Sequence, residues 1–371
     1  HGAVCFVGPA QTGKALDVDT PIPVPGGWSR MGDLVAGDLV FGDDGLPCRV
    51  LAAHAVQLHR PCYRVDFSDG TSIVADDEHL WAVERFYWKA PHWREEVVTT
   101  AQMRNAGVIY QGNRQRFHIR NAGPLLLPAI SLPIDPYVLG VWLGNGTAAT
   151  DVFSFWDRDL PHYAEEFHKA GVRVTASQDG PNTVWMKAPS LRETLFDEGL
   201  RSNKHIPRPY LRASFEQRLA LLQGLLDTDG YPGEVGKSAV EFSTTSDRLK
   251  DEVLELVRSL GLRPMAARKE TTWVHRGERR YGAAWRVTFS AYPGIALFRL
   301  ARKAEKYQPA EMDIRIRGVL SVTPVSSRPV RCIRVDNPRS LFLAGPGMVP
   351  THNTVALVDG WLSHAIANDP G

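Results

Sequence analysis

The sequence predicts two β-rich segments that fold together and are interrupted by a mixed α/β domain. Residues 15–100 have the short apolar–polar alternation and turn residues of β structure, and short strand patterns return from 317 to 349. Helical periodicity begins only between these two segments. A chain of 371 residues is long enough for two or three domains, so this order indicates one domain inserted into another.

The first segment contains recognisable strands and turns. Cys62–Phe67 alternates apolar and polar side chains, and Ser68–Gly70 forms a turn into a second strand over 71–75. Met31–Val40 leads into another turn at Gly42–Gly45. This succession of short strands predicts an antiparallel, mainly β domain.

The middle of the chain predicts helices. Pro136–Gly144 and Glu216–Asp227 carry apolar residues on the faces expected of packed helices. An amphipathic helix is expected over Ser246–Leu260, with Ser246 or Asp247 as its N-cap. These helices define the inserted α/β part.

Composition describes an ordinary globular protein. The formal net charge is +2, with 23% charged and 43% hydrophobic residues, which excludes a polycation. No apolar run reaches the roughly 18 residues of a membrane span, and we expect no signal peptide and no membrane association. The four cysteines have no metal-site spacing. We therefore expect a reduced, cytoplasmic setting and a monomer.

The two ends of the chain carry the halves of a divided phosphate-binding loop. Gly8 to Lys14 match G-x-x-x-x-G-K, but Ala15 stands where a Ser or Thr is needed. Joining Lys14 to Thr354 supplies that hydroxyl and restores a strand, a phosphate loop and a helix start. The rejoined loop would bind ATP and Mg²⁺ through Gly8, Gly13, Lys14 and Thr354. The sequence thus predicts that residues 15–353 excise themselves.

The end of the excised segment has suitable chemistry. The Asn353 side-chain amide can attack its own carbonyl and cut the chain, and His352 can assist with proton transfer. Thr354 can accept an acyl group as an oxygen ester. Together with Ala15–Ile22 and Phe342–Gly345, these residues resemble the opening and closing blocks of an intein. The resemblance implies a mainly β Hint (horseshoe) splicing domain over 15–132 and 319–353, between host flanks 1–14 and 354–371.

Ala15 departs from the usual intein pattern because it has no nucleophile. Trp81, Cys332 and Thr351 together resemble the marker residues of class 3 inteins, which lack a nucleophile at the first position. The chain is then either a natural class 3 intein or one inactivated by substitution at Ala15.

The class 3 resemblance implies a mechanism that needs no cofactor. The Cys332 thiolate attacks the Lys14 carbonyl, and His79 polarises or protonates the departing amide. The acyl group passes to Thr354, and Asn353 cyclises. Trp81 is expected to pack around the Cys332 site, while Asp76 stands where many inteins carry Thr.

The inserted part resembles a second family. Leu222–Gly230 closely matches the LAGLIDADG motif and Val138–Gly146 is a looser copy, so residues 133–318 resemble an α/β (α+β) LAGLIDADG homing endonuclease. The resemblance implies that Asp229 and Asn145 meet at the helix ends and bind Mg²⁺, with Lys204 assisting. An amide is a poorer Mg²⁺ ligand than a carboxylate. We therefore expect binding to double-stranded DNA at the intein-free host site, with weak or absent cleavage.

Residues 263–286 are rich in Arg and Lys interleaved with Trp273, Tyr281 and Trp285, which favours strands that follow DNA phosphates. The amino-acid sequence of the phosphate loop resembles that of a phage terminase large subunit, which implies a phage-encoded host ATPase in a bacterial cell. Three other interpretations remain: a free-standing homing endonuclease, an ATPase with a retained insertion, and a Hedgehog-like autoprocessing domain.

Overall fold

The computed structural model describes residues 14–87, 92–110, 112, 114–233, 238–275, 278–309 and 316–352. The chain divides into two compact units, of which the first comprises residues 1–122 and 316–371 and the second residues 123–315. Each unit has its own hydrophobic core. Among the described helices, none is long and apolar enough to cross a membrane.

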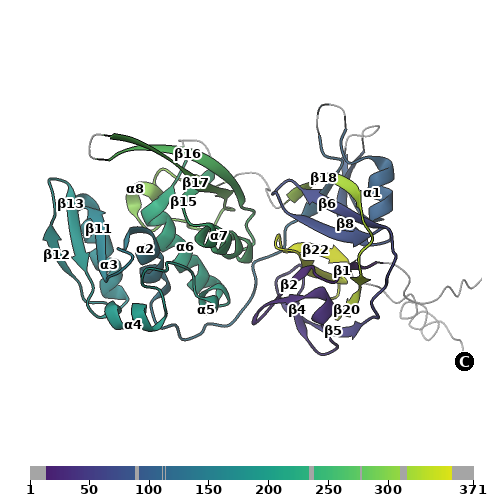
Figure 1. The fold of residues 1–371 in the computed structure, drawn as a ribbon, viewed down its shortest axis with the longest axis horizontal. Helices are drawn as coiled ribbons and strands as arrows, with labels where there is room; N and C mark the ends of the chain where they lie inside the picture. The colour runs from purple at the N-terminus through teal and green to yellow at the C-terminus, as the bar shows by residue number, and fades with distance from the viewer. Residues whose placement is uncertain are drawn as a thin grey trace, which may run out of the picture. The chain divides into compact units, whose positions relative to one another are not determined.

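The first unit is built mainly from antiparallel strands (Figure 1). Its largest sheet has the strand order β19-β1-β7-β6-β18-β10-β8-β9. These strands are β1 (Leu16–Asp17), β6 (Cys62–Phe67), β7 (Ser72–Asp76), β8 (Leu80–Tyr87), β9 (His92–Thr99), β10 (Phe117–Arg120), β18 (Ile316–Val325) and β19 (Val330–Arg331). The predicted turn at 68–70 joins β6 to β7, with Asp66 opposite Ser72.

Smaller sheets and one helix complete this unit. The remaining strands are β2 (Pro21–Val24), β3 (Gly27–Arg30), β4 (Leu39–Phe41), β5 (Pro47–Ala53), β20 (Ile333–Val335), β21 (Leu341–Ala344) and β22 (Val349–His352). A 3-10 turn, η1 (Met31–Asp33), occupies part of a segment predicted as β structure. The helix α1 (Thr100–Ala106) was not predicted, although a capping box of Thr99 and Gln102 marks its start.

The second unit is inserted between two paired strands of the first. In the register of β10 with β18, Arg120 lies opposite Ile316 and His118 opposite Gly318. The chain therefore leaves and re-enters the first unit at neighbouring positions. The predicted insertion limits are 133 and 318, whereas the two compact units divide at 123 and 315. At the second limit, residues 316–318 belong to β18 of the first unit.

The second unit contains the predicted motif helices side by side, α2 (Pro136–Asn145) and α6 (Phe215–Asp229) (Figure 1). They approach closely at glycines. A Cβ on Gly140 would lie 2.3 Å from the Leu221 carbonyl oxygen, and one on Gly224 would lie 2.2 Å from that of Tyr137. The small residues of both motifs thus allow backbone-to-backbone packing.

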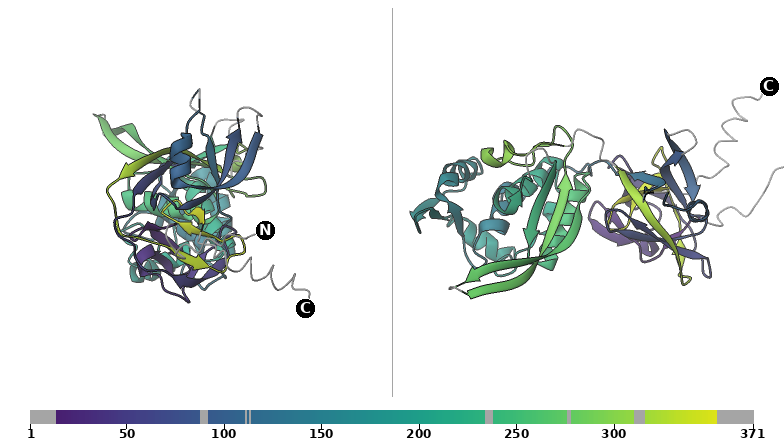
Figure 2. Two further views of the ribbon diagram at one scale, coloured as in Figure 1. Left: turned by 90° about the vertical axis from the view of Figure 1, so that its right-hand side faces the viewer. Right: turned by 90° about the horizontal axis from the view of Figure 1, so that it is seen from above.

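Two sheets accompany these helices. One has the order β11-β13-β12, with β11 (Val152–Trp156), β12 (Thr175–Gln178) and β13 (Thr183–Lys187). The other has the order β14-β15-β17-β16, with β14 (Gly230–Tyr231), β15 (Ala239–Thr244), β16 (Met265–His275) and β17 (Glu278–Ser290). The last two form a long ribbon at the edge of their sheet (Figure 2).

The remaining helices pack around these elements. They are η3 (Asp157–Asp159), α3 (Leu160–Lys169), α4 (Leu191–Asp197), α5 (Arg208–Leu211), α7 (Asp247–Ser259) and α8 (Ala301–Ala304). The Ser246 hydroxyl caps α7 by accepting a hydrogen bond from the Leu249 amide, which confirms Ser246 rather than Asp247 as the cap.

Gly224→Ala is expected to lower the free energy of unfolding of the second unit by about 1–3 kcal/mol, because the added methyl group overlaps the Tyr137 carbonyl. Thermal unfolding measures the change. Gly180→Ala is the matched control, since its Cβ would meet nothing within 4 Å. Equal melting temperatures for the two variants would contradict the close helix contact.

Candidate functional site

The Lys14–Ala15 peptide bond lies at the start of β1, between β7 and β19. Leu16 is paired with Ala75 on one side and with Arg331 on the other. One residue earlier, the same register sets Ala15 opposite Asp76 and Cys332, and the Asp76 amide donates to the Ala15 carbonyl at 2.9 Å. Residues directly opposite each other on antiparallel strands project from the same face of the sheet. The register therefore brings Cys332 and Asp76 to either side of Ala15.

His79 contacts the carbonyl side of this peptide bond. Its Nδ1 lies 3.0 Å from the Lys14 carbonyl oxygen, and its Nε2 is hydrogen-bonded to the Thr351 hydroxyl. Complete burial lowers the pKa of His79 to about 3, so the ring is neutral near pH 7. A carbonyl oxygen only accepts, which requires the single N–H on Nδ1. Nε2 then accepts the hydrogen bond from Thr351.

Asp76 contacts the nitrogen side of the same bond. The Ala15 amide donates to Asp76 Oδ1 at 3.1 Å, and Arg60 Nη2 lies 3.3 Å from Oδ2. Asp76 is fully buried, and burial raises its pKa to about 6, while the Ala15 hydrogen bond and the Arg60 charge oppose that shift. The sequence analysis did not assign Asp76 a role, although its position three residues before His79 is visible in the sequence.

Cys332 is buried in a small apolar cluster with Ala15, Cys62 and Val330. It lies between β19 and β20, where its carbonyl accepts a hydrogen bond from the His54 amide at 3.0 Å. The neighbouring Arg331 donates hydrogen bonds to the carbonyls of His54 and Gly32. The structure thus brings Cys332 to the cluster that contains Ala15.

Trp81 packs against His79. The two rings meet edge to face with centroids 4.9 Å apart, and the indole N–H donates to the Thr100 hydroxyl at 3.0 Å. The Trp81 side chain is fully buried in the main core of the first unit, outside the small cluster that contains Cys332. Its direct contact is therefore with the histidine.

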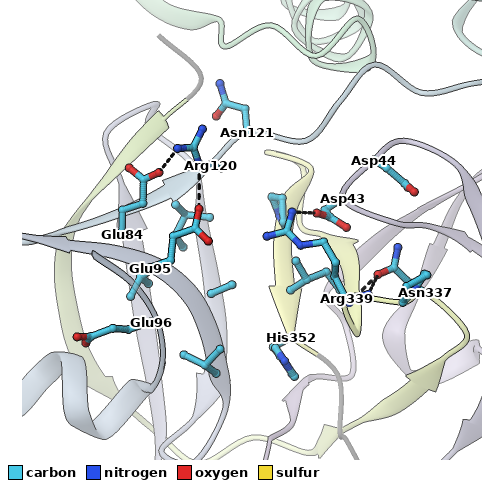
Figure 3. A pocket seen from close by; sticks show the side chains of 17 residues that line it. Asp43, Asp44, Glu84, Glu95, Glu96, Arg120, Asn121, Asn337, Arg339 and His352 are labelled. Carbon is cyan, nitrogen blue, oxygen red and sulfur yellow. Dashed lines mark hydrogen bonds and ion pairs between the residues drawn. The ribbon is translucent and has the colours of Figure 1, made fainter. Parts of the chain in front are cut away.

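The C-terminal side of the site lies on β22. Thr351 is buried, and the next residue, His352, lines a cavity of about 640 Å³ in the first unit (Figure 3). Arg120, paired with Glu84, lies on one side of this cavity, and Arg339, paired with Asp43, lies on the other. The predicted residues Asn353 and Thr354, like Gly8 and Gly13, lie outside the described residues.

The second unit brings the two motif helix ends together. A Cβ on Gly144 would lie 2.0 Å from the Thr228 hydroxyl and 3.2 Å from Asp229 Oδ2, so the end of α2, at Asn145, adjoins Asp229. Lys204 donates to the Leu143 and Gly144 carbonyls at 2.9 and 3.1 Å. Burial lowers the pKa of Lys204 to about 8, opposed by the charge of Asp229.

Lys303 has a matching position that the sequence analysis missed. Its ammonium group donates to three carbonyls at the end of α6, those of Leu226, Thr228 and Gly230, at 2.7–2.9 Å. Burial lowers its pKa to about 8, and the charges of Asp227 and Asp229 oppose this. The sequence around Lys303 carries no motif that would have identified it.

These residues fit a Mg²⁺ ion poorly. Mg²⁺ is usually bound by carboxylate oxygens, but of Asp229 and Asn145 only Asp229 supplies one. At both helix ends, lysine ammonium groups donate hydrogen bonds to the backbone carbonyls. Within the described ranges, no group of three or more His, Cys, Asp or Glu side chains could hold a metal ion.

The predicted basic strands are β16 and β17, but part of their charge is neutralised. Lys269 and Arg286 both pair with Glu241, and Arg268 pairs with Asp247. Arg276 and the side chains of Trp273 and Arg280 lie outside the described residues. The basic ribbon is therefore less positive than the count of Arg and Lys predicts.

Comparisons with known proteins agree with the two-part architecture. A family model described as a LAGLIDADG-like domain matches residues 216–284. A replicative DNA helicase DnaB of Mycobacterium intracellulare is 38% identical over 369 residues, covering 94% of this chain. The chain spans 60% of that relative's length. An iron-sulfur cluster assembly SufBD family protein of Mycobacterium leprae is 25% identical over 293 residues, which cover 70% of this chain and 33% of that protein.

Two solved structures are also similar to this chain. The crystal structure of the MchDnaB-1 intein is 19% identical, with a TM-score of 0.31, and covers 91% of this chain and 100% of its own. The structure of I-DmoI in complex with DNA and Ca is 15% identical, with a TM-score of 0.31, and covers 47% of this chain and 95% of its own.

The fold class predicted from the sequence is confirmed in its architecture: a mainly β unit is interrupted by an α/β unit, and residues 216–284 of the latter match the LAGLIDADG-like model. The predicted terminase host has no support: the similar protein that covers 94% of this chain is a replicative DNA helicase. A bacteriophage origin has no support either. A phosphate loop identifies a nucleotide-binding chemistry that many ATPase families share, so its seven residues could not identify the host.

His79 is expected to remain neutral, with its proton on Nδ1, between pH 5 and 8. NMR measurement of its ring ¹⁵N shifts in the Cys332→Ala chain tests this. Because the folded pKa of about 3 lies below the ordinary value of 6.5, the unfolded chain binds the proton first. The free energy of unfolding should therefore fall as pH drops below 6.5. A titration of His79 centred near 6.5 would contradict the burial that we describe.

Proposed function

We propose that residues 15–353 are a self-splicing element that cuts itself out and joins Lys14 to Thr354. The proposal rests on the side-chain contacts made with a single peptide bond. His79 contacts the carbonyl oxygen of Lys14–Ala15, Asp76 contacts its nitrogen, and the strand register sets Cys332 opposite Ala15. A structural β domain has no need for a buried His and a buried Asp on a single backbone amide.

Backbone strain at the junction favours the same proposal. Lys14 has a φ of 76°, in the left-handed region that non-glycine residues rarely adopt. Such a conformation costs on the order of 1–3 kcal/mol and persists where the surrounding contacts impose it. Cleavage of the bond after Lys14 would release this strain, so part of the activation energy is already present in the folded precursor.

His79 would act as the electrophile in the first step. Its Nδ1–H donates to the oxygen on which negative charge develops when a nucleophile adds to the Lys14 carbonyl carbon. The Thr351 hydroxyl holds the required tautomer by donating to Nε2. Thr351 is thus a positioning residue, and Trp81 fixes the plane of the same ring from its edge.

Cys332 would supply the nucleophile that Ala15 lacks. Its thiolate would attack the Lys14 carbonyl and displace the Ala15 nitrogen, leaving the upstream segment as a thioester. Transfer to the Thr354 hydroxyl, cyclisation of Asn353 with help from His352, and rearrangement of the ester to an amide would complete the reaction. Every group in this sequence belongs to the chain, so splicing requires no cofactor.

The relatives support an inserted element rather than an integral part of a host enzyme. A helicase and an iron-sulfur assembly protein have different described activities, yet each matches most of this chain. We infer that the host here is a replicative helicase of the P-loop class. Its ATP and Mg²⁺ site would form only when Lys14 meets Thr354, because the loop lysine and the Mg²⁺-binding hydroxyl are otherwise held apart.

The inserted domain would bind double-stranded DNA with little or no cleavage. The LAGLIDADG-like match and the basic ribbon of β16 and β17 support DNA binding. Of the two motif positions, Asn145 and Asp229, only Asp229 has a carboxylate, and Lys204 and Lys303 supply positive charge at the helix ends. Binding should consequently need no divalent cation.

Cys332→Ala is expected to abolish splicing and cleavage after Lys14, because it removes the nucleophile. Intact mass spectrometry of a chain with lengthened flanks distinguishes precursor, excised 15–353 and joined flanks. Cys62→Ala is the control, since Cys62 is a buried thiol of the same apolar cluster and should splice normally when replaced. Normal splicing by the Cys332 variant would refute the mechanism, and a wild-type chain of unchanged mass would refute splicing itself.

Asn145→Asp is expected to create a Mg²⁺ site by setting a second carboxylate beside Asp229. The wild-type affinity for host-site DNA should change less than twofold between EDTA and Mg²⁺ at equal ionic strength. Mg²⁺ should raise the melting temperature of the variant only. At a Mg²⁺ concentration of 100 times its Kd, binding adds about 2.7 kcal/mol to the free energy of unfolding. Gln178→Glu adds the same charge on exposed β12 and should show no such effect. Efficient Mg²⁺-dependent cutting by the wild type would contradict this proposal.

A further inference from the structure

Breaking an amide releases an amine that must gain a proton, and within the described part of the chain Asp76 is the side chain hydrogen-bonded to that nitrogen. Asp76 Oδ1 lies 3.1 Å from the Ala15 nitrogen, whereas His79 is hydrogen-bonded to the carbonyl oxygen and to Thr351. Since His79 has its one proton on Nδ1, it has none to give to the nitrogen. Another residue must therefore protonate the leaving nitrogen.

We propose that the Asp76 carboxyl group protonates the Ala15 nitrogen as the Lys14–Ala15 bond breaks, an inference that rests on the splicing reaction proposed above. The Sγ–C bond from Cys332 to the Lys14 carbonyl carbon forms, and the C–N bond breaks with its electron pair left on nitrogen. That pair takes the proton of Asp76. The thiol proton goes to solvent and Asp76 regains one from solvent, so the net step moves one proton from sulfur to nitrogen.

The surroundings of Asp76 suit a proton donor. The carboxyl group is fully buried, and its burial favours the protonated form. Arg60 reaches it from outside, but the same guanidinium also contacts Asp77 and Glu78, both at 3.1 Å, so its charge is shared among three carboxylates. The other titratable neighbours are His79, which is neutral, and the Cys62 thiol, whose pKa burial raises. Arg60 therefore stabilises the ionised form of Asp76 with only part of its charge.

Asp76→Asn tests this role, because the amide keeps the size and the acceptor oxygen but has no acidic proton. We expect the rate of cleavage after Lys14 to fall at least about 100-fold, the lower range for general acid catalysis. Asp66→Asn is the matched control: it removes a carboxylate of the neighbouring strand β6 that pairs with Arg64 and not with Arg60. It should splice within about threefold of the wild type.

The pH profile separates acid catalysis from a purely structural role. Above pH 6 the protonated fraction of Asp76 falls about tenfold per pH unit, while the ionised fraction of an ordinary thiol rises by the same factor below about pH 8.5. The wild-type rate should therefore be nearly flat from pH 6 to pH 8. The residual rate of Asp76→Asn should instead rise about tenfold per unit, since only the thiolate contributes.

The outcomes are distinguishable. A wild-type chain that fails to join its flanks overturns the splicing reaction, and this inference with it. A wild-type chain that splices while Asp76→Asn splices equally fast, with the same flat profile, overturns only the role of Asp76. If Asp76→Asn does not fold, as judged by its melting temperature, Asp76→Glu decides: splicing with a flat profile supports the inference, and a folded but inactive Glu variant overturns it.

Discussion

The pairing of β1 with β7 and β19 is the constraint on which the candidate splicing site depends. A strand of two residues, Leu16–Asp17, is held between segments that lie far from it in the sequence. This pairing alone determines what lies opposite Ala15. A slip of one residue would turn Asp76 and Cys332 to the other face of the sheet. The chemistry of the junction is therefore a consequence of strand register, and interactions that fix the register act on the reaction as well.

The same sheet explains how a second domain can be inserted without disturbing the site. β10 and β18 are neighbours, and Arg120 lies opposite Ile316 where the chain leaves and returns. The free energy needed to close a loop grows only slowly with the length of the loop. A folded domain can therefore replace a short hairpin loop between two paired strands at little additional cost. Each unit has its own core, and Cys332, His79 and Asp76 all belong to the first.

The sequence predicted the architecture well because both parts carry local patterns. Strand alternation, the Ser246 cap and the glycines of the motif helices depend on neighbouring residues, and each recurs in the structure. The role of Asp76 could not be predicted, because it depends on a pairing across 61 residues of chain. Lys303 was missed for the same reason: three carbonyls of a distant helix end define its position.

The buried Lys303 and the half-buried Lys204 stabilise the junction of the two motif helices. The C-terminal ends of α2 and α6 carry the negative ends of two helix dipoles and, with Asp229, would repel each other where they meet. Lys204 and Lys303 place an ammonium group on each end, and their carbonyl contacts satisfy backbone acceptors that the helices leave unpaired. Because these contacts need no divalent cation, the chain's own side chains are sufficient to stabilise the helix junction.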